Sequence, residues 1–161
     1  MKASLLSSVI YIGLACILVA GCGNRRDLFY PTLVEAEKAG ELNRGWVPVY
    51  LPKTSRAIHL VEQDSPSTEW GGFEFTPADS QELRKHLKNV DALPPSVRRV
   101  SNPGGSWWPA VLKGKLDDGK IHGEGFELYV VEDPADSVSI WVELFAIDWS
   151  KGRGFFYGRR E

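Results

Sequence analysis

The hydrophobic residues of the chain begin as one nearly continuous run and only later alternate with polar ones. The run covers residues 5–19, follows Lys2 and is followed by Ala20-Gly21. A positive residue, a short apolar stretch and small residues before a cleavage point are typical of a secretory signal peptide. The run is also short for a membrane span, which needs roughly 20 apolar residues. We therefore predict that residues 1–21 are a cleaved signal peptide, with an uncleaved transmembrane anchor as the alternative.

The next residue, Cys22, changes the kind of signal that is predicted. Val19-Ala20-Gly21-Cys22 resembles the lipobox of bacterial lipoproteins, in which the Cys carries lipid, palmitate included, and becomes the new N-terminus. Because two or more acyl chains anchor a protein stably, the resemblance implies attachment to a membrane of the cell envelope. Gly23 in place of Asp is similar to the pattern sent to the outer membrane of Gram-negative hosts, facing the periplasm. Cys16 leaves with the signal, so we expect no intramolecular disulfide.

The residues after Cys22 predict a tether and one folded domain. Residues 22–30 are expected to form the lipidated N-terminus and a short polar tether, and residues 31–161 a single globular domain. A mature chain of about 140 residues suits one domain with its own core.

Two helices are predicted inside this domain. Thr32 and Glu35 have the spacing of a capping box, and the helix that they begin is expected to end at Gly40. A second helix follows residues 76–79, where Thr-Pro-Ala-Asp supplies a cap, a proline at the first helical position and an acid in the first turn. Leu83 lies on the apolar side of this second helix.

Strands dominate the rest of the domain. β-branched and aromatic residues favour extended chain in five segments, which are residues 57–61, 69–76, 125–131, 138–147 and 154–157. Turn residues at 150–152 predict a hairpin between the last two, and Asp117-Asp118-Gly119-Lys120 is expected to be another hairpin turn. The pattern predicts an α+β fold, with a mostly antiparallel sheet of about five strands and one or two helices packed on one face.

Composition and motifs exclude several functions. The formal net charge of −2 offers no basic stripe for nucleic acid. No phosphate-binding glycine loop, paired-Cys site or nucleophile elbow is present, and the three histidines are widely spaced. We therefore expect no metal, no cofactor and no catalytic residues.

Two groups of residues remain as candidates. Acids at 117–127, Glu124 and Glu127 among them, could supply the two facing carboxylates of a glycosidase, although turn chemistry explains Asp117 and Asp118 as well. Trp107-Trp108 lies in a Pro/Gly-rich stretch, and exposed aromatic rings can stack on a sugar or anchor a protein partner. The alternative for the Trp pair is that its loop packs back over the sheet. Trp107 and Trp108 are thus the candidate binding surface.

A wider resemblance runs through the mature chain. It is carried by Gly45-Trp46-Val47-Pro48, Ile58-His59, Trp70 with Phe73-Glu74-Phe75, and the closing Ile147-Asp148 and Phe156-Tyr157. These residues are similar to those of an uncharacterised family of small bacterial lipoproteins, of the kind called YbbD-head-like. The resemblance implies a lipoprotein without an assigned reaction or ligand. We expect a non-catalytic binding or inhibitory module whose partner is an envelope protein or glycan, with a cell-wall glycan hydrolase or a structural envelope component as alternatives.

Overall fold

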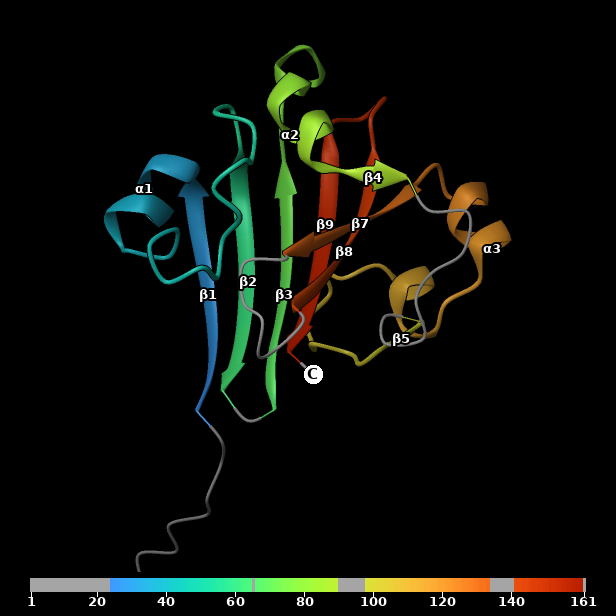
Figure 1. Cartoon of the computed structure of the whole chain (residues 1–161), viewed down its shortest axis with the longest axis horizontal. Coiled ribbons are helices and arrows are strands. Elements are labelled where there is room, and N and C mark those ends of the chain that lie inside the picture. The colour runs from blue at the N-terminus through green and yellow to red at the C-terminus, as the bar shows by residue number, and fades with distance from the viewer. Residues whose placement is uncertain (1–23, 65, 90–97, 134–140, 161) are drawn as a thin grey trace, which may run out of the picture.

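An antiparallel sheet of seven strands organises the molecule (Figure 1). The computed structural model describes residues 24–64, 66–89, 98–133 and 141–160, so residues 1–21 and Cys22 lie outside it. In the order β1-β2-β3-β9-β8-β7-β4, the strands are β1 (Arg25–Thr32), β2 (Arg56–Asp64), β3 (Ser67–Glu74), β9 (Arg153–Arg160), β8 (Trp141–Asp148), β7 (Glu127–Asp133) and β4 (Lys88–Asn89). Every neighbouring pair is antiparallel.

The other elements are short. A separate two-stranded sheet is formed by β5 (Arg99–Val100) and β6 (Gly114–Lys115). The α-helices are α1 (Leu33–Lys38), α2 (Gln81–His86) and α3 (Asp118–Gly123), and the 3₁₀ turns are η1 (Pro77–Asp79) and η3 (Ala110–Leu112). Within the described residues, no helix is long and apolar enough to cross a membrane. The fold is thus mostly β with minor helix.

Both faces of the sheet are buried. Side chains alternate between the faces along a strand, and in β2 the neighbours Leu60 and Val61 are both inaccessible to solvent but belong to different core clusters. One cluster, on what we call the α1 face, contains residues of α1 and α2, Val47 and Leu51. The other, on the α3 face, contains residues of η3 and α3. The prediction of helices on one face only was therefore wrong, because the chain between β5 and β7 supplies a second covering layer.

The strand count was also underestimated. Residues 25–30 were expected to belong to the tether, but Arg25–Thr32 forms β1 and pairs with β2 along its whole length. As an edge strand, β1 alternates between exposed and half-buried side chains and carries little apolar signal. The last strand, β4, has only two residues and no sequence signal of its own.

The capping box of α1 and the β8–β9 turn were predicted correctly, whereas Thr76 forms no side-chain cap and Pro77–Asp79 is the 3₁₀ turn η1 rather than the start of a helix. Thr32 and Glu35 form the capping box of α1, with each side chain bonded to the other residue's backbone N–H. The β8–β9 hairpin turns at the predicted residues 150–152. The prediction at Asp117 was wrong: its carboxylate accepts a hydrogen bond from the Lys120 N–H and caps α3, so a helix takes the place of a hairpin turn.

Candidate functional site

Three glutamates form a row across the middle of the sheet. Glu62 lies opposite Glu69 in the β2–β3 pair, and both Glu69 and Glu143 lie opposite Gly158. Because directly opposed residues of antiparallel strands point to the same face, all three carboxyl groups emerge on the α1 face. We call Glu62, Glu69 and Glu143 the acidic row. None of them is more than 5% exposed, which is unusual for charged side chains.

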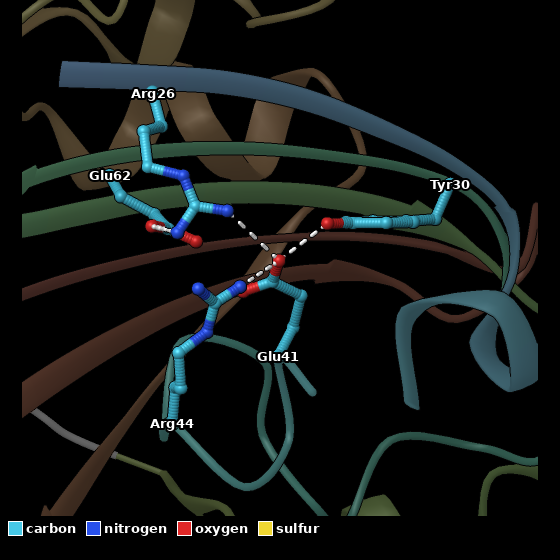
Figure 2. A network of polar contacts seen from close by, with 5 residues as sticks. All are labelled: Arg26, Tyr30, Glu41, Arg44 and Glu62. Atoms are coloured by element: carbon cyan, nitrogen blue, oxygen red, sulfur yellow. Dashed lines mark hydrogen bonds and ion pairs between the residues drawn. The ribbon is translucent and has the colours of Figure 1, made fainter. Parts of the chain in front are cut away.

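A fourth buried glutamate reaches the row from above the sheet. Glu41 belongs to residues 41–50, which we call the cover segment, and is itself inaccessible to solvent. Figure 2 shows its carboxylate between Arg26 of β1, Tyr30 of β1 and Arg44 of the cover segment. The Arg26 guanidinium lies 3.3 Å from Glu41 and 3.0 Å from Glu62, so it bridges the cover segment and the row.

The far end of the row has a different environment. The Tyr50 hydroxyl of the cover segment donates a hydrogen bond to Glu143 at 2.8 Å. Glu143 also shares a hydrogen bond with Glu69, so one of these two carboxyls must carry a proton. The Tyr50 ring stacks on His86 of α2 with ring centres 4.6 Å apart. The cover segment therefore contacts both ends of the row.

The two carboxyls at the Arg26 end, Glu62 and Glu41, have pKa values that are shifted in opposite directions. Burial raises the pKa of Glu62 to about 7, and its hydrogen bond to Glu41 and the charge of Glu41 act in the same direction. Burial would also raise the pKa of Glu41, but hydrogen bonds from Tyr30, Glu62 and Arg44 outweigh it and lower that pKa. Glu62 is therefore the neutral partner and Glu41 the ionised one. For the same reasons burial, and then Glu41, raise the pKa of Tyr30 to about 12.

Glu143 also favours its neutral form. Burial raises its pKa to about 7, against the hydrogen bonds from Tyr50 and Glu69 that lower it. Among the described residues, one oxygen each of Glu62 and Glu143 has no hydrogen-bond partner unless a neighbouring carboxyl is protonated. The site therefore holds two carboxyl pairs, Glu41–Glu62 and Glu69–Glu143, in which Glu62 and Glu143 take up protons as the pH falls through about 7.

The buried carboxyl pairs can bind protons. A pair of carboxyls that share a proton can act as acid and base, but a substrate cannot touch these groups while the cover segment lies over them. In the part of the chain that the structure describes, no group of three or more His, Cys, Asp or Glu side chains is placed to hold a metal ion.

The predicted aromatic pair is split between core and surface. Trp108 is 3% exposed, donates its indole N–H to the Leu112 carbonyl and belongs to the α3-face core. Trp107 is half-buried and stacks on His59 with ring centres 5.1 Å apart. The Phe29 ring also packs against His59, and Phe29 is 55% exposed. An aromatic surface is thus present, but it consists of Phe29 and part of Trp107 rather than both tryptophans.

A small cavity lies beneath Trp108. It is lined by apolar side chains of the α3-face core and has a volume of about 10 Å³. This is about the minimum that a single water needs, so it offers no room for a ligand.

The other predicted acids have local structural roles. Asp117 caps α3, Glu124 ends the same helix and is exposed, and Glu127 accepts a hydrogen bond from the Tyr129 hydroxyl. Burial, opposed by Asp27, lowers the pKa of His59. None of these contacts forms the facing carboxyl pair that a glycosidase requires.

Sequence reasoning missed the acidic row, although one of its members carries a signal. Glu143 stands within the strongly apolar run of residues 141–147, where a charge has to be buried. Glu62 precedes and Glu69 follows the β2–β3 turn, where acids are ordinarily solvated. Only the register of four strands brings them together.

No protein-family model, curated protein or solved structure matches the chain. The resemblance to YbbD-head-like lipoproteins therefore stays a prediction from the sequence.

Proposed function

We propose that the chain is a lipid-anchored lipoprotein of the bacterial cell envelope, whose domain is a non-catalytic binding or inhibitory module. The observation that carries this proposal is that β1 begins at Arg25, so only Gly23 and Asn24 separate Cys22 from the sheet along the chain. Three residues of extended chain span roughly 10 Å. Lipid on Cys22 would thus hold the domain directly on the membrane surface, with no stalk between them.

This attachment would also orient the domain. The start of β1 and the β2–β3 hairpin lie at the same end of the sheet, because Arg25 is opposite Gln63 (Figure 1). That end would face the lipid, and the opposite end, with α2 and the β8–β9 turn, would face a partner in the envelope. A non-catalytic role is supported by the burial of the acidic row and by the local roles of Asp117 and Glu127.

Metabolic palmitate labelling with membrane fractionation tests the anchor. Changing Cys22→Ala is expected to abolish the label and to move the protein from the membrane to the soluble fraction, because the acyl chains supply the binding energy. The chain offers a matched control in Cys16→Ala, which should keep both label and membrane association. Membrane retention of unlabelled Cys22→Ala would contradict the proposal and would mean that residues 5–19 remain as an anchor.

The binding role needs a separate test. The lipidated wild type, cross-linked in intact cells, is expected to yield a reproducible envelope partner that the Cys22→Ala chain does not capture. Peptidoglycan zymography of the purified protein should show no clearing. Clearing that is lost in Glu124→Gln or Glu127→Gln would overturn the non-catalytic assignment in favour of a cell-wall glycan hydrolase, whereas repeated absence of any partner would favour a structural component.

A further inference from the structure

The acidic row is covered by a segment that combines local backbone hydrogen bonds with apolar and polar contacts to the sheet. Within residues 41–50, the Glu41 N–H bonds to the Ala36 carbonyl, and the Trp46 and Val47 N–H groups bond to the Glu41 carbonyl. Val47 and Pro48 are buried, and Leu42, Trp46 and Tyr50 pack against the α1-face core. The polar attachments of the segment to the sheet converge on the buried carboxyl groups.

The charges facing the row differ between its two ends. Glu62 faces Arg26 from β1, Glu69 from β3, and Glu41 and Arg44 from the cover segment. Two positively charged arginine side chains therefore lie at the Glu62 end of the row.

At the other end, Glu143 faces Glu69 from β3 and the Tyr50 hydroxyl from the cover segment. His86 of α2 lies behind Tyr50. The residues opposite Glu143 in the neighbouring strands are Val131 and Gly158, which carry no charge.

Loss of the shared protons would leave this site with excess negative charge. Two carboxylates in hydrogen-bond contact repel strongly in a buried environment. At the Glu143 end the Tyr50 hydroxyl could still donate, but its hydrogen bond cannot neutralise two charges. The repulsion would be relieved if water reached the row, and the cover segment contacts the row at both ends on this face.

We propose that residues 41–50 form a pH-dependent cover, which is closed while each carboxyl pair of the row shares a proton and opens when those protons are lost. Gly40, directly before the segment, has a φ of +84°, and a Cβ at this position would meet nothing within 4 Å, so the chain has room to move here when the segment loses its hydrogen bonds. Opening of the cover does not depend on lipid attachment, so its test is independent of the test of the proposed function.

Hydrogen–deuterium exchange of the mature chain tests this device directly. Peptides that contain the amides of Glu41, Arg44, Trp46 and Val47, all bonded to backbone carbonyls in the closed form, are compared at pH 6 and pH 8.5 after correction for intrinsic exchange rates. We expect their protection to fall by about tenfold or more, since one pKa unit corresponds to a tenfold change in a protonation equilibrium. Peptides of β3 should remain more strongly protected than the cover segment at pH 8.5, although the fall in global stability lowers their protection too.

Variants identify the groups responsible. Glu62→Gln with Glu143→Gln should keep the cover segment protected at both pH values, because an amide stays neutral and can still donate a hydrogen bond. Glu74→Gln changes a glutamate of β3 that is 55% exposed and pairs with Arg56 outside the row, and it should retain the full pH effect. The wild-type pH series alone keeps the proposal falsifiable if the double variant fails to fold. Equal protection of the cover segment at both pH values would overturn the cover, and so would protection of β3 at pH 8.5 that is as low as that of the cover segment. A pH effect that persists in the double variant would overturn it as well.

Discussion

Gly71→Ala is expected to destabilise the domain by about 3 kcal/mol, at the upper end of the usual cost of overpacking a core. Gly71 lies in the centre of β3, opposite Leu60 and Phe156. An added Cβ would come within 1.9 Å of the Phe156 ring. That ring is fully buried and packs against Phe73 and Phe145, with ring centres 6.3 and 5.7 Å away, so it has no free direction in which to move.

Urea denaturation of three variants measures this effect. Gly123→Ala is the matched control, because a Cβ at Gly123 meets nothing within 4 Å and its backbone is not in the left-handed region, so stability should be unchanged or slightly higher. Adding Phe156→Leu to Gly71→Ala should recover part of the loss, although Phe156→Leu alone is destabilising. A loss from Gly71→Ala no larger than that of the control would contradict the packing described here.

Parts of the fold with self-contained local chemistry were predictable from the sequence. The capping box of Thr32 and Glu35 needs only four consecutive residues, and the turn at 150–152 joins two strands that are close in the chain. Such signals depend on neighbours along the sequence. They therefore survive in the folded protein.

Features that depend on distant contacts were not predictable. The strand β1 is stabilised by pairing with β2 across α1 and the cover segment, while its own sequence alternates only weakly. The short helix α3 begins with residues that fit a turn equally well, and it is retained because Ile121 is buried in the α3-face core. These elements are decided by tertiary packing rather than by local propensity.

The acidic row depends entirely on contacts between residues that are distant in the sequence. A shift of one residue in the β2–β3 register would send Glu62 to the α3 face and dissolve the row. Glu41 joins it only because α1 ends at Lys38 and the chain then turns back over the sheet. The sequence shows four glutamates in four unrelated segments, and their proximity comes from the topology alone.

The stability of the domain is expected to fall by several kcal/mol as the pH rises from about 5 to about 8. Burial raises the pKa of Glu62 and of Glu143 from 4.5 to about 7 in the folded state. Between these values the folded chain binds more protons than the unfolded chain, so unfolding becomes easier as the pH rises. The stabilisation is complete below about pH 4.5 and is lost through pH 7, and each carboxyl contributes about 3 kcal/mol at 1.36 kcal/mol for each pKa unit.

Two other acids act in the opposite direction at lower pH. Glu41 and Asp148 are buried, which would raise their pKa values, but hydrogen bonds from Tyr30 to Glu41 and from Ser150 to Asp148 help to lower both. Groups with lowered pKa values stabilise the fold above their unfolded pKa and lose this effect in acid. The stability maximum should therefore lie near pH 5, on the acidic side of neutrality.

Urea denaturation at pH 5 and pH 8 distinguishes these contributions. Glu62→Gln and Glu143→Gln should each reduce the difference between the two pH values and be more stable than wild type at pH 8, because neither amide has a proton to lose. Glu74→Gln, with its exposed side chain, should leave the difference unchanged. If wild-type stability instead rose between pH 5 and pH 8, Glu62 and Glu143 would have to be ionised in the folded state. The row would then need compensating cations beyond Arg26 and Arg44, and the protonated carboxyl pairs described here would be wrong.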